Sequence, residues 1–402
     1  MTEPPAAPVA YLDHAATTPM YPEVIEAMTG QLARLGNASS LHGSGRSARR
    51  VVEESREMIA ATLNSRPSEV VFTSGGTESD NLAVKGFFWA RRADDHRRTR
   101  VLATAVEHHA VLDALHWLGT DAGAEVELLP VDTDGRLDMA ALRESIERDP
   151  DGVALITVML ANNEVGTLQP VDEVVAVAAP YGIPVHTDAV QALGQLPLDF
   201  ATSGVDAMTV TSHKIGGPFG VGALLVRRDA ELVALIHGGG QERDVRSGTI
   251  DAPGIVGFAA AAELAVKGQP GRAMAAAELR DELIRRVRHV VPDAQLNGPG
   301  GERRLPGNAH LSFPGCEGDS LLMLLDAQGI ECSTGSACSA GVPQASHVLL
   351  AMGRDEASAR GSLRFSLGHT STPADIERVV DAIGPAVERA RAAGVADIGD
   401  LQ

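Results

Sequence analysis

The sequence predicts an α/β fold with a mostly parallel sheet and a smaller α/β domain toward the C-terminal end. From about residue 70 to residue 226, short apolar runs alternate with helical patterns, as in sheets whose parallel strands are joined by helical crossovers. Polar residues gather where these apolar runs end. After Gly254 longer helical stretches replace the alternation. These three observations predict two parts, each with its own core.

The predicted strands of the large part are short and rich in Val, Ile, Leu and Ala. They are VVF (70–72), VLATAV (101–106), VALITVML (153–160), IPVHTD (183–188), AMTVTS (207–212) and GALLV (222–226). The polar clusters at their ends are TSGG (73–76), EHH (107–109), NNE (162–164), TDAVQ (187–191) and SHK (212–214). Ligands bind at the carboxyl ends of strands in open α/β sheets, so these clusters predict one shared pocket.

The remainder of the chain predicts the smaller domain. Its expected elements are helices at residues 255–266 and 273–291, strands at 309–313 and 363–367, and an amphipathic helix from about residue 372. We expect a large domain of residues 21–255. Residues 1–20 and 256–402 would form the small domain, which would carry a loop with Cys338.

Composition excludes several classes of protein. The chain has 402 residues and a formal net charge of −19, which repels nucleic acid and anionic lipid, so neither is an expected partner. It has no run of 18 apolar residues, and its start, MTEPPAAPVA, lacks the pattern of a signal peptide. We therefore expect a cytoplasmic location. Three cysteines without C-x-x-C spacing argue against a disulfide framework and a metal site.

The segment VVFTSGGTESDNLAVKG (70–86) predicts a strand, a glycine turn and a helix. Gly76 and Thr77 stand where the helix begins. The free N–H groups of a helix start, with a threonine hydroxyl beside them, could bind a phosphate. For this segment taken alone, the alternative is an ordinary glycine turn with a threonine cap.

Lys214 lies between a predicted strand and a glycine-rich turn. Its amine could form a Schiff base if its pKa were lowered, although a lone lysine in a loop is usually a solvated surface charge. Asp188 and His108 end two other predicted strands. A Schiff-base lysine, a carboxylate for a pyridinium nitrogen and a phosphate cup are what pyridoxal 5'-phosphate requires. His108 could lie flat on its ring, or be a partly buried histidine satisfied by its neighbours.

Two further residues suggest substrate chemistry. Arg364, in GSLRFSLG, could clamp a carboxylate with two parallel hydrogen bonds or lie exposed on an edge strand. Cys338 lies in ECSTGSACSAG, a segment of small residues that suits a mobile thiol. Cys316 and Cys332 are interpreted as small buried hydrophobes.

Motifs along nearly the whole chain, from about Tyr11 to past Leu367, together resemble the cysteine desulfurases of the NifS/IscS type, within the class V aminotransferase group. The motifs are YLDHAATTP, GNASSLHGSGR, FTSGGTESDNLA, EHHAVL, ANNEVGTLQP, HTDAVQALG, SHKIGGPFGVGAL, GGGQERDVRSGT, STGSACSAG and LRFSLG. The resemblance implies a pyridoxal-phosphate enzyme of fold type I. It also implies a homodimer with each active site near the subunit boundary.

The same resemblance assigns roles to residues that match its motifs. Lys214 would be the Schiff-base lysine, Asp188 the partner of the pyridinium nitrogen, His108 the residue that stacks on the ring and transfers protons, and Cys338 the catalytic thiol. The other implied residues are Asn163 and Gln191 near the ring hydroxyl; Gly76, Thr77, Thr211, His213 and the neighbouring subunit's own copy of Thr249 at the phosphate; and Asn37 and Arg364 at the substrate carboxylate.

The activity implied is removal of sulfur from L-cysteine, which leaves L-alanine and a persulfide on Cys338. The implied acceptor is an iron–sulfur scaffold or another sulfur-acceptor protein, in cluster assembly and other thio-cofactor or tRNA thiolation pathways. No resident metal is expected, although Cys338 could be a transient cluster ligand shared with a scaffold. The alternatives are a selenocysteine lyase or aminotransferase on the same scaffold, and a noncatalytic sulfur carrier or assembly subunit.

Overall fold

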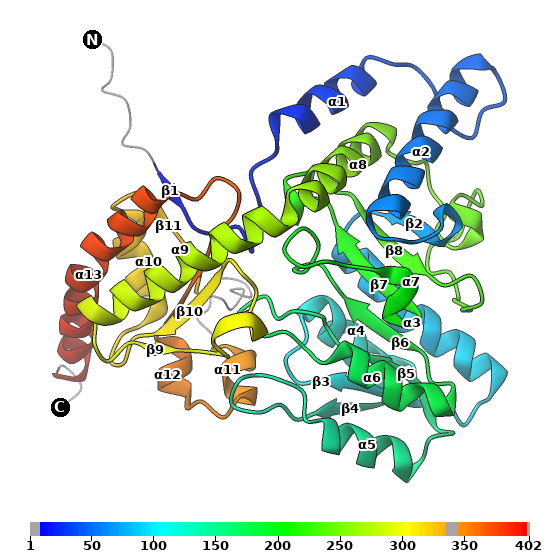
Figure 1. Cartoon of the computed structure of the whole chain (residues 1–402). Helices are drawn as coiled ribbons and strands as arrows, with labels where there is room; N and C mark the ends of the chain where they lie inside the picture. The colour runs from blue at the N-terminus through cyan, green and yellow to red at the C-terminus, as the bar shows by residue number, and fades with distance from the viewer. Residues whose placement is uncertain (1–8, 335–344, 400–402) are drawn as a thin grey trace.

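The largest element of the computed structural model, which describes residues 9–334 and 345–399, is a seven-stranded sheet (Figure 1). Strand β8 runs antiparallel to both of its neighbours, and the other pairs are parallel. This confirms the predicted α/β fold with a mostly parallel sheet. The strand order is β2 (Val70–Thr73), β8 (Gly222–Val226), β7 (Ala207–Thr211), β6 (Val185–Asp188), β5 (Val153–Thr157), β3 (Arg100–Thr104) and β4 (Glu125–Leu129).

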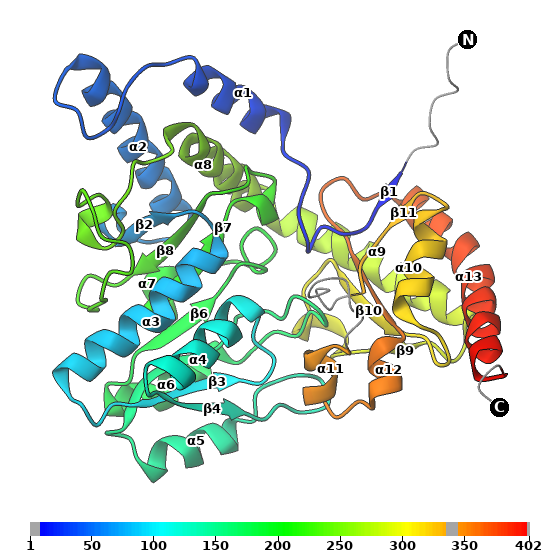
Figure 2. The ribbon, with the colours of Figure 1, turned by 180° about the vertical axis from the view of Figure 1, so that it is seen from behind.

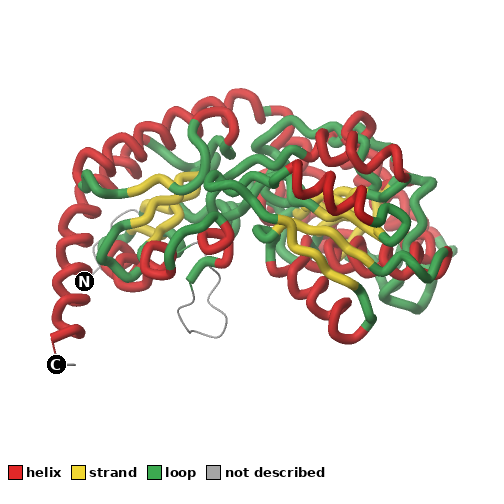
Figure 3. The backbone as a smooth tube through the Cα atoms, turned by 90° about the horizontal axis from the view of Figure 1, so that it is seen from below, coloured by secondary structure: helices red, strands yellow, loops and turns green. Residues whose placement is uncertain are grey.

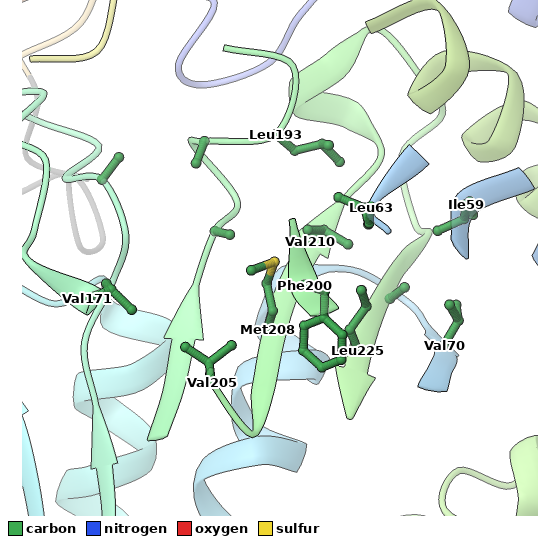
Figure 4. Packing of buried hydrophobic residues seen from close by; sticks show 14 of the residues in the cluster. Ile59, Leu63, Val70, Val171, Leu193, Phe200, Val205, Met208, Val210 and Leu225 are labelled. Carbon is green, nitrogen blue, oxygen red and sulfur yellow. The ribbon is translucent and has the colours of Figure 1, made fainter. Parts of the chain in front are cut away.

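Alternate side chains of the sheet enter two different cores, one on each face. In β2, Val70 and Phe72 belong to the first core, while Val71 belongs to the second. Figure 4 shows Met208 and Leu225 among the residues of the first core. Because both faces are covered, the strands have the continuous apolar sequences from which they were predicted.

Helices cover both faces of the sheet (Figures 1 and 2). One face carries α3 (Gly76–Asp94) and α4 (His109–Asp121). The other carries α2 (Gly43–Thr62), α5 (Met139–Arg148), α6 (Val171–Ala178), α7 (Phe200–Ser203) and α8 (Ala252–Lys267), with α1 (Pro22–Leu32) packed on α8. Short 3-10 helices lie at Pro67–Glu69, Ala179–Tyr181, His213–Ile215, Glu242–Asp244 and Gly301–Arg303.

A separate hydrophobic core is built from the two ends of the chain, and Figure 3 shows its strands apart from the large sheet. Its strands are β12 (Ser362–Ser366), β10 (Asn308–Ser312) and β9 (Gln295–Leu296), which are antiparallel, and the parallel pair β1 (Ala10–Tyr11) and β11 (Ile330–Glu331). The helices around it are α9 (Gln269–Val290), α10 (Gly318–Asp326) and α13 (Pro373–Gly399). Helices α11 (His347–Ala351) and α12 (Glu356–Arg360) pack in a further small core together with Val106 and Val165 of the large part.

Each strand predicted for the large part is present, but β4 was not predicted. Glu125 and Glu127 interrupt its apolar sequence, and it is an edge strand with exposed side chains. The two helices predicted after Gly254 correspond to α8 and α9, which meet at Gly268. Because α8 packs into the core of the large sheet, we propose that the division between domains lies near Gly268 rather than at the predicted residue 255.

Candidate active site

A cavity of about 420 Å³ lies where β2, β5, β6 and β7 end. Ala15, Ala16 and Ser333, from the segments around the second core, close its other side. The structure brings together most of the predicted site residues in this cavity, which supports the expectation of one shared pocket. They are Gly76, Thr77, His108, Asn163, Asp188, Gln191, Thr211, His213, Lys214 and Arg364.

The predicted phosphate cup is the start of α3. Gly75, which precedes the helix, has a φ of 146°, a conformation that favours glycine. Gly76 opens the helix, so its first N–H groups lack partners within the helix and face the cavity end of the sheet. Thr211 and His213, after β7, line the same cavity. These groups form a cradle of donors that can bind an anion.

Lys214 is held by the N-terminal segment. Its Nζ donates to the carbonyl oxygens of Ala15 at 2.5 Å and Ala16 at 2.7 Å. Gln191 Nε2 donates to the same Ala15 carbonyl at 3.0 Å. Burial, with a contribution from the positive charge of Arg364, lowers the pKa of Lys214 to about 8. An amine with this pKa can lose its proton near neutral pH and act as a nucleophile.

Asp188 ends β6, and its Oδ1 accepts the N–H of Val190 at 2.8 Å. Burial raises its pKa to about 6. Asp80, which the sequence reasoning missed, also lines the cavity, and its Oδ1 is buried without a hydrogen-bond partner. Burial and the nearby Asp188 raise the pKa of Asp80. Asp80 lies four residues after Gly76 on α3, so helical spacing was a signal that could have placed it on the cavity side.

Glu107 and His186 form a buried polar layer next to the cavity. Glu107 belongs to the predicted EHH cluster, but the sequence analysis gave neither residue a role of its own. Glu107 accepts the Thr104 hydroxyl at 2.6 Å and the Met159 N–H at 3.0 Å, and burial raises its pKa to about 8. His186 Nε2 lies 3.7 Å from Asp80 Oδ1, and burial lowers the pKa of His186 to about 3. His186 is two residues before Asp188, so strand periodicity predicts the same face for both.

His108 stands on the cavity wall at the start of α4. Its Nδ1 accepts the N–H of Ala110 at 3.1 Å, so the neutral ring carries its proton on Nε2. Although the ring is exposed to the cavity, the surrounding protein lowers its pKa to about 4, and the charge of Lys214 adds to this effect. The imidazole is therefore neutral near pH 7.

Arg364, on β12, points inward rather than lying exposed on an edge strand. Its Nη2 donates to Asp13 Oδ1 at 2.9 Å, and its Nη1 donates to the Asn163 carbonyl at 3.0 Å. Its Nε is buried without a hydrogen-bond partner. The pairing with Asp13 had not been predicted from the sequence. The guanidinium therefore lines the cavity with Nη1 and Nη2 already paired to groups of its own chain.

Cys338 lies outside the described residues, so its role stays a prediction. The residues on both sides of that gap are attached close to the cavity. The N–H of Arg364 donates to the Ser333 carbonyl at 2.6 Å, and the Ser346 hydroxyl donates to the Glu164 carboxylate. Cys332 is 8% exposed in the second core, and burial raises its pKa to about 12, which makes it a poor nucleophile.

Two predicted residues are not in the cavity. Asn37 is exposed, and its side chain accepts the N–H of Ser39 at 2.9 Å. Thr249 is also exposed and does not line the cavity of its own chain. Their predicted roles at the substrate carboxylate and at a neighbouring subunit's phosphate stay predictions.

The donors of this cavity fit pyridoxal 5'-phosphate. Lys214 supplies an amine of lowered pKa, Asp188 a buried carboxylate, and the start of α3 free N–H groups for a phosphate. Across residues 9–334 and 345–399, no three His, Cys, Asp or Glu side chains group to hold a metal ion. Within the same residues, no helix has the length and apolar character needed to cross a membrane.

Comparisons with known proteins identify the family of the chain. The family model "Aminotransferase class-V" matches residues 10–379. An IscS-like cysteine desulfurase of Mycobacterium tuberculosis is 59% identical over 97% of this chain and 99% of its own length. A cysteine desulfurase IscS of Dictyoglomus turgidum is 43% identical over 95% of each chain.

Comparison with solved structures also finds proteins of the NifS type. A NifS-like protein superposes with a TM-score of 0.87 at 35% identity, covering 95% of this chain and 100% of its own. A NifS-like protein from Rickettsia africae gives a TM-score of 0.86 at 31% identity, covering 95% of this chain and 100% of its own. By sequence and by fold, the chain belongs to the class-V aminotransferase family, among the cysteine desulfurases of the IscS and NifS type.

Proposed function

We propose that the chain is a pyridoxal phosphate-dependent cysteine desulfurase that converts L-cysteine to L-alanine and forms a persulfide on Cys338. One observation carries the proposal. A single cavity joins Lys214, Asp188 and the start of α3, which suit the cofactor, to Arg364 and Ser333, which lie on the substrate side. A pocket with only the first group would suit many cofactor enzymes. The second group adds a site for a carboxylate and the approach to the thiol.

The cofactor, when bound, supplies an electron-withdrawing ring that stabilises negative charge at the substrate α-carbon. Arg364 binds the substrate carboxylate through the guanidinium N–H groups that it presents to the cavity, in competition with Asp13 at Nη2. Lys214 takes up and releases a proton at Nζ because its pKa is near 8. The neutral His108 ring can donate a hydrogen bond from Nε2.

Sulfur transfer then follows a balanced exchange. The carbon–sulfur bond of cysteine breaks, and a sulfur–sulfur bond forms to the Cys338 thiolate. The products are L-alanine and the Cys338 persulfide, so the step needs no outside oxidant. An acceptor thiol, on an iron–sulfur scaffold or another sulfur-acceptor protein, removes the outer sulfur. We place this chemistry in the cytoplasm, where reducing conditions keep acceptor thiols free.

We further propose that the enzyme is a homodimer. Leu35, Leu41 and Phe219 expose between 69% and 89% of their surface in the single chain. A second copy of the chain that covered these side chains would remove their apolar surface from water, which is favourable. Thr249, which is exposed and outside its own cavity, is proposed to contribute to the phosphate cup of the second copy.

Intact-mass analysis after addition of L-cysteine tests the proposal. The wild-type chain should gain the mass of one sulfur atom and release one alanine, while Cys338→Ala should gain none. Cys316→Ser is the matched control, because Cys316 is buried in the second core and should leave the gain unchanged. Alanine formation without sulfur on the chain, or sulfur mapped to Cys332, would contradict the assignment of Cys338.

A further inference from the structure

The segment of residues 236–250, between β8 and α8, is attached to its own chain at two points. The first attachment is the buried pair of Arg56 and Glu242. The Glu242 carboxylate accepts two hydrogen bonds from Arg56, at 2.7 and 2.8 Å, and one from the Phe72 N–H at 2.8 Å. Arg56 also donates to the Val70 carbonyl at 2.8 Å. This network fixes the first half of the segment to β2.

The second attachment reaches the phosphate cup. Arg246 Nε and Nη2 donate to the two oxygens of Glu78 at 2.7 and 3.2 Å. Glu78 follows Thr77 in the first turn of α3, and its Oε2 also accepts the Ser74 N–H at 2.8 Å. Both side chains are largely shielded, at 20% exposure for Arg246 and 18% for Glu78. A two-bond contact of this kind restricts where the Arg246 backbone can lie.

The backbone between the attachments depends on them. Residues 242–244 have φ values of 44°, 58° and 64°, a region that non-glycine residues avoid. Gln241 Oε1 accepts the Gly248 N–H at 2.8 Å, and Ser247 Oγ accepts the Gly240 N–H at 3.3 Å. The segment is thus a closed loop with a conformation imposed by its side-chain contacts.

This loop presents Thr249 away from its own site. Thr249 lies three residues beyond Arg246, is exposed and does not line its own cavity. Ile236, 42% exposed, lies near it, because the Ile236 carbonyl accepts the N–H of Ser247, two residues before Thr249. Phe219, 69% exposed, packs against the ring of His213 in the cup. The second copy of the proposed homodimer would cover these side chains.

We infer that Arg246 is a positioning residue whose ion pair with Glu78 ties the phosphate cup of one subunit to the Thr249 that this subunit supplies to its partner. The inference rests on the proposed homodimer. Because Glu78 adjoins Thr77 and Arg246 lies close to Thr249 in sequence, a shift in one cup is transmitted to the residue that completes the other.

Mixed dimers test this inference. They are built so that the cofactor site of the mutated chain does not contribute to the measured signal. One chain is wild type and keeps Lys214, so it alone forms the covalent cofactor bond that absorbs visible light. The second chain carries Lys214→Ala and serves only as the supplier of Thr249. The measurement is the cofactor affinity of the wild-type chain, read from that absorbance during cofactor titration, for supplier chains with and without a further substitution.

Arg246→Ala in the supplier chain should weaken cofactor affinity at the other site by about three- to tenfold, since a shielded ion pair then no longer orients Thr249. Thr249→Ala in the supplier should weaken it at least as much. The two substitutions together should add little to Thr249→Ala alone, because Arg246 acts through Thr249. Arg246→Lys should restore part of the affinity, and the exposed Arg228→Ala is the matched control.

The outcomes separate this inference from the proposed dimer. If Thr249→Ala in the supplier weakens the other site but Arg246→Ala does not, the positioning role is overturned and the placement of Thr249 stands. If neither changes the other site, the placement of Thr249 is wrong and the inference is overturned with it. Should the Arg246→Ala chain fail to assemble, Glu78→Gln breaks the same pair from its other side and is judged by the same measurement.

Discussion

The two walls of the cavity are built differently. One wall is the carboxyl edge of the large sheet, where Asp188, Thr211 and Gly76 stand at the ends of strands or the start of α3. The other comes from the second core, where Arg364 lies on β12 and Ala15 on the N-terminal segment. The first wall suits a cofactor that must be held rigidly. The second suits a substrate that must enter, react and leave.

The walls also differ in charge. The sheet wall holds Asp188 and Asp80, with Glu107 behind them, and burial raises the pKa of each carboxyl. The second wall holds an arginine that is already paired, through Asp13. Lys214 lies between the walls, since it extends from the sheet side and donates to the Ala15 carbonyl of the opposite side. Substitutions on each wall should therefore affect different steps.

Lys214→Ala should have the largest effect because this residue contacts both walls. It removes the nucleophile for the cofactor and a proton-transfer group, so turnover should fall on the order of 10³-fold or more. Borohydride reduction followed by peptide mapping should label Lys214 in the wild type and nothing in the variant. A label on Lys85 of α3 or Lys267 of α8 would contradict the assignment.

Cys338→Ala should have the next largest effect, and it should show that the two walls serve different steps of the reaction. The sheet wall is intact in this variant, so cofactor absorbance should be unchanged, while desulfuration should fall nearly to zero. Cys332→Ser is the paired control. It should stay active but unfold more easily, by about 1–3 kcal/mol, because it buries a hydroxyl in the second core. If folded Cys332→Ser protein lost turnover, Cys332 rather than Cys338 would be the catalytic thiol.

Arg364→Ala should act on substrate binding and leave the cofactor in place. Loss of a charge-assisted contact costs about 2–3 kcal/mol, which corresponds to a KM raised by about 30- to 150-fold. Steady-state kinetics should give a much smaller change in kcat. Asp13→Asn sharpens this test, since it keeps Arg364 but removes the negative charge that competes with the substrate carboxylate, and should lower KM. Unchanged kinetics in Arg364→Ala would exclude the carboxylate role.

The same contrast explains how much of the fold and of the site could be predicted from the sequence. The sheet wall was predictable because its strands are continuous apolar runs with polar residues at their ends, and those ends meet at one edge. Strand β4 was not predicted, because Glu125 and Glu127 interrupt its apolar sequence at an exposed edge of the sheet. The second wall is assembled from segments that are far apart in sequence. Nothing local to Asp13 indicates that Arg364, 351 residues away, is its partner.

Buried groups of the site were missed for a related reason. Asp80 and His186 had the right spacing to be placed near Gly76 and Asp188, but their burial depends on how α3 packs over the sheet. The resemblance to a family identified residues by motif and not by position in space. It assigned Asn37 to the substrate carboxylate and Thr249 to the phosphate of a neighbouring subunit. The single chain leaves both residues exposed outside its own cavity, so both roles stay predictions.

The prediction with the smallest expected effect concerns the charge of the sheet wall. It is tested by the pH dependence of the free energy of unfolding. The Glu107 pKa is raised to about 8 in the folded chain, while an unfolded glutamate titrates near 4.3. Between these values the folded state binds more protons than the unfolded state, so this group lowers stability as the pH rises from about 4.3 to about 8. Glu107→Gln removes that proton and keeps an acceptor for the Met159 N–H.

The free energy of unfolding, measured by urea at several pH values, should therefore differ between wild type and Glu107→Gln by an amount that grows with pH. The slope of that difference is at most about 1.4 kcal/mol per pH unit, and the variant gains relative to the wild type as the pH rises toward 8. Contributions from Asp188 and Asp80 are present in both proteins and largely cancel. Glu147→Gln, on the exposed surface of α5, should give a flat difference. If the difference in unfolding free energy between Glu107→Gln and the wild type also did not change with pH, Glu107 would ionise as an ordinary carboxyl. The sheet wall would then carry a negative charge on Glu107 at neutral pH, which contradicts the effect expected from its burial.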